Sequence, residues 1–198
     1  YEVTGVQTCA LPIYTALELA TACEQEFGWK TRFLAKNENW YDLKGVDLLI
    51  VMVDGYDLEK VSHAKTGLIK LAWMRNWFDR WAERPSFDDY DIFLASCGEG
   101  ARFVERAGKE VHLFPIATNS DRFQPGKSGT RTVDVVFTGH KWGVVRDIEK
   151  FLSPSDFPGS LEVYGNGWEN HEKFGPYWRG FVPYERLPEI YSRARIVI

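Results

Sequence analysis

Residues 46–55 of the chain read VDLLIVMVDG. A short, nearly continuous apolar run of this kind is typical of a β-strand that is buried on both faces. The Asp54-Gly55 pair then ends the strand in a turn. Strands buried on both faces occur in parallel sheets with helices packed on each side, so this stretch predicts the centre of an α/β domain.

Short apolar runs and helical stretches alternate in both directions from this strand. Further strands are predicted at residues 29–34, 68–73, 91–96 and 111–114, and helices at residues 15–27, 57–63 and 98–107. Strands that alternate with helical segments in this way favour a parallel, doubly wound sheet. We therefore expect a Rossmann-like domain that covers residues 14–118.

A second unit follows a linker with several Pro, Gly and Ser residues, which we place at residues 119–131. Beyond it, strands are predicted at residues 133–138, 160–164 and 195–198, and helices at residues 143–152 and 184–194. This pattern predicts a second Rossmann-like domain at residues 132–198. Because small ligands often bind between such domains, we expect a cleft between the two units.

The composition excludes several classes of protein. The chain has 198 residues, 24 basic and 28 acidic side chains, and a formal net charge of -4. The acidic excess argues against a nucleic-acid partner, which usually meets a basic surface. No apolar run reaches the roughly 18 residues of a transmembrane segment. The cysteines stand in no metal-ligand spacing, so we expect no metal site, reduced thiols and a cytoplasmic location.

Both ends of the chain have unusual sequences. Residues 3–13, VTGVQTCALPI, match the translation of a common sequencing-adapter oligonucleotide codon for codon. We therefore interpret residues 1–13 as non-native and leave them out of the fold prediction. The alternative is a native edge strand that ends at Pro12. At the other end, residues 195–198 read as the start of a strand, so we expect a gene fragment in which both domains are incomplete.

In open parallel sheets, ligands bind beyond the carboxyl ends of the strands. After the strand at residues 133–138 comes a glycine that permits close backbone approach. Basic side chains and the predicted helix 143–152 follow, and a helix N-terminus offers free N–H groups and a positive dipole end. These groups suit a diphosphate, and the alternative is a solvated turn with surface charges. The candidate residues are Gly139, His140, Lys141 and Arg146.

Two more loops of the second unit could bind a base or a ribose. The first, after the strand at residues 160–164, has paired glycines and an aromatic side chain that could stack on a ring. The second, before the helix at residues 184–194, places a glycine between an arginine and an aromatic residue. A plain turn and a packed hairpin fit these loops equally well. The candidate residues are Gly165, Gly167, Trp168, Arg179, Gly180, Phe181 and Val182.

The first unit has candidate sugar-binding residues after two of its strands. Residues 73–81, WMRNWFDRW, interleave basic and aromatic side chains that could stack on sugar rings and bind hydroxyls or phosphate. The alternative is an amphipathic helix that buries its tryptophans. We assign no catalytic residue. The candidates on this side are Asp54, Arg75, Asn76, Trp77 and Arg80.

Four stretches, in the same order, resemble a known family. They are residues 111–125 (VHLFPIATNSDRFQP), 135–139 (VVFTG), 161–165 (LEVYG) and 180–191 (GFVPYERLPEIY). Over residues 40–198 the chain resembles the group-1 glycosyltransferases with the GT-B fold, and it is most similar to their spore-maturation-protein-like branch, a bacterial type.

The resemblance implies transfer of a sugar, of the hexosyltransferase type, from a nucleoside diphosphate donor to an unknown acceptor. It implies retention of configuration and no metal or other cofactor, with the nucleotide sugar as substrate. Residues 139–141 would face the donor diphosphate and residues 179–182 its base, while the candidates of the first unit would face the acceptor or the donor sugar. Further donor-binding residues of the family would lie beyond Ile198, so the fragment is expected to be inactive alone.

Three alternatives stay open at this point. The first is a nucleotide-binding or carbohydrate-binding module of the same fold without catalysis, since no catalytic acid or base is visible. The second is a nicotinamide-dependent oxidoreductase, which needs a GxGxxG turn that no predicted strand of this chain provides. The third is a scaffold or response-regulator-like α/β domain, which the pattern of two units disfavours.

Overall fold

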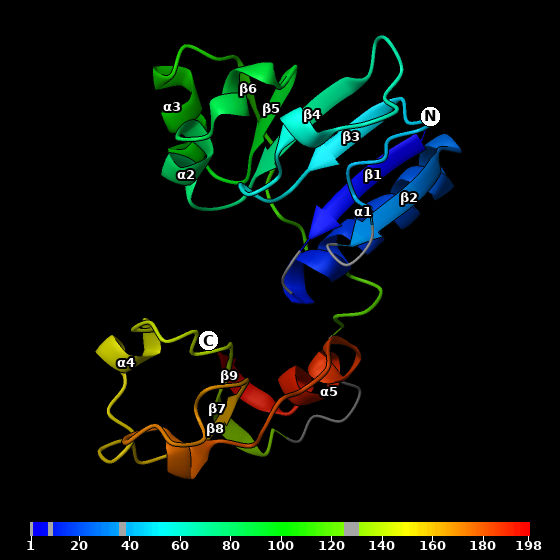
Figure 1. The fold of residues 1–198 in the computed structure, drawn as a ribbon. Coiled ribbons are helices and arrows are strands. Elements are labelled where there is room, and N and C mark those ends of the chain that lie inside the picture. The colour runs from blue at the N-terminus through cyan, green and yellow to red at the C-terminus, as the bar shows by residue number, and fades with distance from the viewer. Residues whose placement is uncertain (1, 8–9, 36–38, 125–130) are drawn as a thin grey trace. The chain divides into compact units, whose positions relative to one another are not determined.

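A computed structural model of the chain describes residues 2–7, 10–35, 39–124 and 131–198. Its contacts divide the chain into two units, Tyr1–Ala117 and Thr118–Ile198. Figure 1 shows both units, and each is described by itself below. Part of the linker predicted at residues 119–131 lies outside the described residues, namely residues 125–130.

The first unit is built on a six-stranded sheet with the order β2-β1-β3-β4-β5-β6, in which every pair of neighbours is parallel. A parallel sheet needs a crossover connection between successive strands, and the helices of the unit supply several of these. The strands are β1 (Glu2–Gln7), β2 (Lys30–Ala35), β3 (Leu48–Val51), β4 (Ile69–Met74), β5 (Ile92–Ala95) and β6 (Val111–Leu113).

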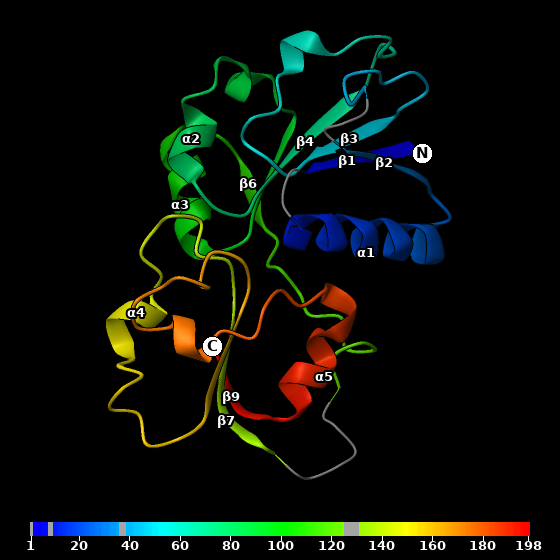
Figure 2. The same ribbon diagram turned by 60° about the horizontal axis from the view of Figure 1, so that its bottom comes forward.

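Helices cover both faces of this sheet, as Figure 2 shows. On one face, α1 (Ala10–Phe27) packs its buried Ala16 in a cluster with Ile50 and Met52. On the other face, α3 (Gly98–Arg106) packs Val104 in a larger cluster that includes Leu49 and other residues of the central strands. The short α2 (Phe78–Ala82) contributes the buried Trp81 to the same cluster. The doubly wound arrangement predicted from the sequence is confirmed.

The segment at the amino-terminal end of this unit was left out of the fold prediction. The structure pairs β1 with both β2 and β3, so this strand lies inside the sheet and not at its edge. The helix predicted at residues 15–27 begins earlier, at Ala10. Backbone pairing gives the place of a segment but not its origin, so the interpretation of residues 1–13 as translated adapter stays a prediction.

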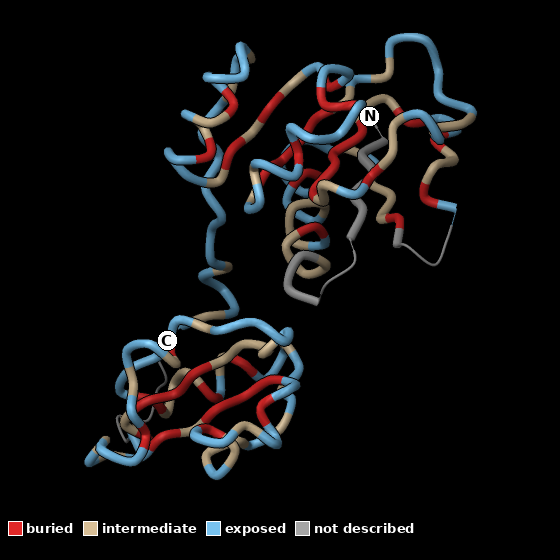
Figure 3. Tube along the Cα trace, turned by 60° about the vertical axis from the view of Figure 1, so that its left-hand side comes forward, coloured by how far each residue is buried: buried red, intermediate tan, exposed pale blue. Residues whose placement is uncertain are grey.

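The second unit is built on a smaller parallel sheet with the order β8-β7-β9. Its central strand carries the core, because Val136 is fully buried and its neighbours on β7 are nearly so. Figure 3 shows the buried residues running along these strands. The strands are β7 (Val133–Thr138), β8 (Leu161–Tyr164) and β9 (Ala194–Val197), and the helices are α4 (Ile148–Phe151) and α5 (Leu187–Ser192).

Two predicted helices of the second unit are shorter than expected. The helix predicted at residues 184–194 is a 3-10 turn at Tyr184–Arg186 followed by α5. The helix predicted at residues 143–152 is reduced to the single turn of α4, because Trp142 (φ 54°) and Gly143 (φ 68°) adopt left-handed backbone conformations that a right-handed helix excludes. This correction removes the helix N-terminus that was expected to face a diphosphate.

Within the described residues, no helix is long and apolar enough to cross a membrane. Cys23 and Cys97 are free thiols, the first buried and the second exposed. The chain is therefore an α/β protein with two parallel-sheet units.

Candidate functional site

Three loops of the second unit meet at the carboxyl ends of β7 and β8. Backbone hydrogen bonds join them: the amide of Gly139 donates to Tyr164 O (2.9 Å), and the amide of Lys141 donates to Asn166 O (3.0 Å). The amide of Gly165 donates in turn to Gly180 O (2.9 Å). Most of the residues that the sequence nominated in this unit are therefore brought together in one place, which we call the loop junction (residues 139–142, 165–168 and 178–181).

Glycine is required at the centre of the loop junction. Gly165 has φ +127°, and a Cβ atom added there would lie 2.3 Å from the carbonyl oxygen of Gly139. Gly167 has φ +88°, with its virtual Cβ 3.0 Å from the Cβ of Lys141. A Cβ atom added at Gly139 would lie 3.0 Å from the Phe137 ring. The paired glycines therefore serve close packing of backbone on backbone.

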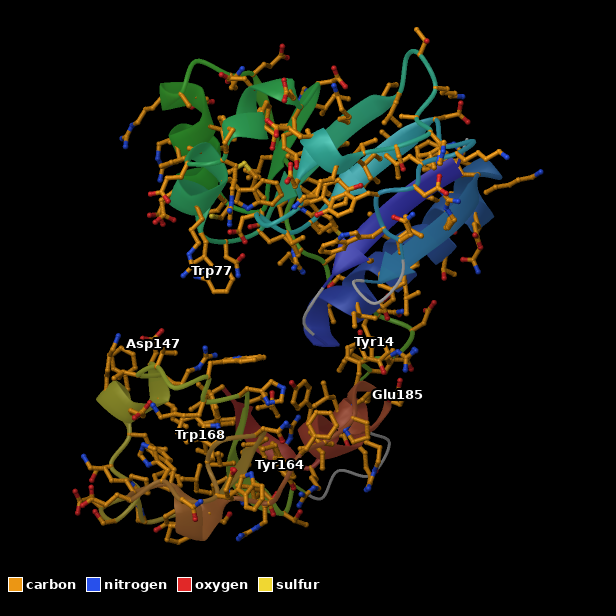
Figure 4. The ribbon with its side chains drawn as sticks, in the orientation of Figure 1. Tyr14, Trp77, Asp147, Tyr164, Trp168 and Glu185 are labelled. Carbon is orange, nitrogen blue, oxygen red and sulfur yellow. The ribbon has the colours of Figure 1, made fainter. Side chains whose placement is uncertain are left out.

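Trp168 is not available for stacking on a ligand, so its assignment to a base or ribose is wrong. Its side chain is fully buried among Phe137 and Phe174, and its indole N–H donates to the carbonyl of Gly139 (2.7 Å). Figure 4 labels Trp168 within the second unit. Because Trp168 is buried and its one hydrogen-bond donor is satisfied, its role is structural: it packs under the loop junction and stabilises it.

Lys141 is held by an internal ion pair instead of projecting freely toward solvent. Its Nζ lies 3.0 Å from Oε1 of Glu149, and the other oxygen of Glu149 lies 3.0 Å from Nε2 of His171. The side chains of these three residues are between 16% and 18% exposed. Burial raises the pKa of the Glu149 carboxyl, but hydrogen bonds from the Arg146 amide, Lys141 and His171 outweigh it and lower this pKa to about 2.

Arg146 places a positive charge beside the loop junction. A Cβ atom added at Gly139 would lie 3.5 Å from Nη2 of Arg146, so the guanidinium group lies beside this glycine. The pKa of the Asp147 carboxyl is lowered by its hydrogen bond with Lys150 and, to a smaller extent, by the nearby charge of Arg146. Lys141, by contrast, is in direct contact with a carboxylate. An anion at the loop junction would therefore meet Arg146 before Lys141.

His140 is held in one protonation pattern by the neighbouring loop. The amide of Asn166 donates to Nδ1 of His140 (2.9 Å), so the proton of the neutral ring resides on Nε2. The ring stacks on Phe181, with centroids 6.0 Å apart and planes within 8°, and it meets the Trp142 ring edge to face at 5.0 Å. Nε2–H thus remains a hydrogen-bond donor on an aromatic cluster.

The other candidates of the second unit are divided. The guanidinium group of Arg179 donates to carbonyl oxygens of its own loop, at Pro176 (3.4 Å) and Trp178 (3.3 Å). Gly180 has φ +93° and open space where a side chain would be. Val182 instead packs against the core cluster of Val136 and Ile190, which takes its side chain away from a ligand.

Sequence reasoning missed two residues of this region and gave a third no role. Glu149 and His171 lie eight and thirty residues from Lys141, and no short motif connects them. Trp142 follows the nominated Gly139–Lys141 stretch directly, and its side chain is 62% exposed. Its neighbour Gly143 is the one local signal for a turn that could have drawn attention to it.

The candidates of the first unit do not form one group. Asp54 pairs with Arg84 (3.2 Å), which lies after α2. Trp77 is 55% exposed with φ 49°, and the guanidinium carbon of Arg80 lies 4.4 Å from the centroid of its ring. The carbonyl of Arg75 accepts a hydrogen bond from the hydroxyl of Ser96 (2.9 Å). Asn76 is exposed. The alternative that this stretch buries its tryptophans holds for Trp73 and Trp81, which are 3% exposed.

A metal ion finds no ready site among the described residues. Across residues 2–7, 10–35, 39–124 and 131–198, no group of three or more His, Cys, Asp or Glu side chains could hold one. Two carboxylates next to the loop junction already accept hydrogen bonds: Glu149 from Lys141, His171 and the Arg146 amide, and Glu169 from the amide of Gly167 (2.8 Å).

Comparisons with known proteins give a fold and no sequence family. No family model matches the chain, and no curated protein matches its sequence. Solved structures of T4 phage β-glucosyltransferase are similar to it. The complex with UDP and Mn²⁺ has a TM-score of 0.60 at 17% identity, and the complex with the UDP-glucose substrate has a TM-score of 0.62 at 16% identity; both alignments cover 100% of this chain and 72% of the other.

A further similar structure is described as the DNA modifying enzyme β-glucosyltransferase in the presence and absence of uridine diphosphoglucose. Its TM-score is 0.62 at 16% identity, and the alignment covers 100% of this chain and 70% of the other. The chain therefore has the GT-B type of fold that its sequence predicted.

The comparison corrects one expectation. The family resemblance implied an enzyme without a metal cofactor, whereas a structure of the same fold contains Mn²⁺ together with UDP. The prediction of no cofactor is thus contradicted. The described residues of this chain do not themselves offer a group of side chains that fits a metal ion.

Proposed function

We propose that this chain is part of a glycosyltransferase that takes a sugar from a nucleoside diphosphate sugar, and that the loop junction binds the nucleoside diphosphate. The observation that carries the proposal is the placement of Arg146, His140 and the tight Gly139–Gly165 contact at the carboxyl ends of β7 and β8. In parallel sheets this is the edge at which ligands bind. The UDP and UDP-glucose in the structures of similar fold support the same ligand class.

The chemistry asked of the protein is stabilisation of the negative charge that develops on the departing diphosphate. Arg146 can supply a forked cationic donor, and Nε2–H of His140 can supply a neutral one. Lys141 has an indirect role in this proposal. Its ion pair with Glu149 stabilises the turn that carries His140 and Arg146. Prepositioned donors of this kind need no rearrangement as charge develops.

Calorimetric titration of the protein with UDP-glucose in a buffer containing Mn²⁺ tests the proposal. We expect Arg146→Ala to weaken binding about tenfold or more, since a hydrogen bond to a charged group contributes about 1.5–3 kcal/mol. Lys141→Ala should weaken binding less. The matched control is Arg186→Ala, because Arg186 belongs to the same unit, is 61% exposed and pairs with Glu189.

Turnover and binding test different parts of the proposal. Release of UDP from UDP-glucose in the presence of acceptors supports transfer, while binding of UDP-glucose without release of UDP supports the donor site, because the chain is expected to be inactive alone. Absence of binding to UDP, GDP and ADP sugars would contradict the proposal as a whole.

The acceptor and the stereochemistry are finer proposals. On the family resemblance we propose a hexose donor and retention of configuration, which NMR of the anomeric proton of the product would test. We propose an acceptor other than nucleic acid, because the net charge is -4. Although a structure of similar fold is described as a DNA modifying enzyme, a screen in which duplex DNA is one of the acceptors would decide this point.

A further inference from the structure

Three aromatic rings form an exposed platform on the loop junction. The ring of His140 stacks on Phe181 and also meets the Trp142 ring edge to face. Trp142 is 62% exposed and Phe181 is 55% exposed, so most of both rings faces solvent. We call the rings of His140, Trp142 and Phe181 the aromatic platform.

The backbone holds Trp142 outward at an energetic cost. Trp142 has φ 54°, a left-handed conformation that is unfavourable for a bulky side chain. Hydrogen bonds on both sides maintain the turn: the amide of Lys141 donates to Asn166 O (3.0 Å) and the amide of Val144 donates to Lys141 O (3.1 Å). Conformations of this kind persist where the surroundings enforce them, and they are concentrated at ligand sites.

The groups next to the platform indicate what it would bind. The guanidinium group of Arg146 lies beside Gly139, directly before His140, and Nε2 of His140 carries a proton. The exposed rings of Trp142 and Phe181, next to a cation and a hydrogen-bond donor, fit a ligand with a planar ring on one side and an anion on the other. A nucleoside diphosphate has both parts, whereas a free sugar, whose ring is puckered and uncharged, and an aliphatic chain have neither.

We propose that the nucleobase of the donor stacks on the aromatic platform, with Trp142 as its main contact, while the diphosphate binds Arg146. This inference rests on the proposed function and deepens it. It replaces the buried Trp168 with the exposed Trp142 as the stacking residue. Because every base has a π-face, the contact is tolerant of base identity.

Trp142→Gly gives a sharp test, because function and stability should move in opposite directions. Glycine adopts the left-handed conformation readily, so the free energy of unfolding should be unchanged or higher. Affinity for UDP should fall about tenfold, in the range that loss of one base–aromatic stack produces. Trp142→Phe keeps a ring and should restore most of the affinity. The control is Phe151→Ala, since Phe151 is the most exposed aromatic side chain of the same unit at 83%.

Titration with UDP, uridine and inorganic pyrophosphate distinguishes the two proposals. The stacking proposal requires Trp142→Gly to weaken UDP and uridine and to leave pyrophosphate unchanged. If wild-type protein binds UDP and Trp142→Gly binds it equally well, stacking is overturned while the proposed function stands. If wild-type protein binds uridine but neither UDP nor pyrophosphate, the platform stands and the proposed diphosphate site falls. If wild-type protein binds none of the three, both are overturned.

Discussion

The carboxyl edges of the two sheets are built differently. At the edge of the first sheet, the candidate side chains are separate from one another: Asp54 pairs with Arg84, and Trp77 lies against Arg80. At the edge of the second sheet, the loops bond to one another through backbone amides, and Trp168 supports them from beneath. Similar sequence signals, polar and aromatic residues after a buried strand, thus give separate surface features in one unit and a single connected structure in the other.

The largest expected difference concerns the two tryptophans that were nominated by the same reasoning. Trp168→Ala should lower the free energy of unfolding of the second unit by about 3–5 kcal/mol, because a fully buried aromatic side chain and its bond to Gly139 are lost. Trp77→Ala should cost about 1 kcal/mol or less, since the ring is 55% exposed and its contact is with the exposed Arg80. Urea unfolding followed by circular dichroism compares them, and equal losses would abolish the distinction.

A smaller difference should appear between two glycines with left-handed backbone. Gly165→Ala places a methyl group on the carbonyl of Gly139 and should destabilise the second unit by about 2–3 kcal/mol. Gly67→Ala in the first unit, where φ is +85° and nothing lies within 4 Å, should cost about 1 kcal/mol. Thermal unfolding of both variants is the measurement. A loss at Gly165 no larger than that at Gly67 would mean that the contact between the loops is loose.

The smallest effect is a dependence on pH. The pKa of Glu149 is lowered from 4.5 to about 2, so the folded state binds fewer protons than the unfolded state between these values. The stability that Glu149 contributes is therefore complete above pH 5 and is lost as the pH falls toward 2. We expect Glu149→Gln to cost about 1–2 kcal/mol at pH 7 and to flatten this decline.

Glu189→Gln is the matched control for this pH dependence, because the side chains of Glu189 and Arg186 are 63% and 61% exposed. It should leave the pH dependence of unfolding unchanged. A decline of the same size in both variants would show that Glu149 is not its source.

The strands were predictable because burial on both faces leaves continuous apolar runs such as LLIV in β3 and VDVVFT in β7. The helix predicted at residues 143–152 failed because periodicity does not reveal the left-handed φ of Trp142. The assignment of Trp168 to a base or ribose failed for a related reason. Trp168 and Trp142 both follow a strand in a glycine-containing turn, and only packing against Phe137 and Phe174 decides that Trp168 is the buried one.

The candidate site was predictable in position but not in its connections. Gly139 and Gly165 were nominated as openings for a ligand, yet the two residues lie against each other, and that contact joins strands whose loops are 26 residues apart in sequence. The ion pairs of Glu149 with Lys141 and His171 could not be predicted from the sequence either, because the partners of a side chain depend on the tertiary structure.

The backbone bonds between the loops have a consequence for the timescale on which this region opens. The amides of Lys141 and Gly165 donate to neighbouring loops, and those of Gly139 and Arg179 donate to β8, in the way that strand amides do. In deuterium exchange they should therefore be protected like the amides of β7 and unlike those of ordinary surface turns. A ligand arriving at this edge would find the backbone already ordered, so little conformational entropy would be lost on binding.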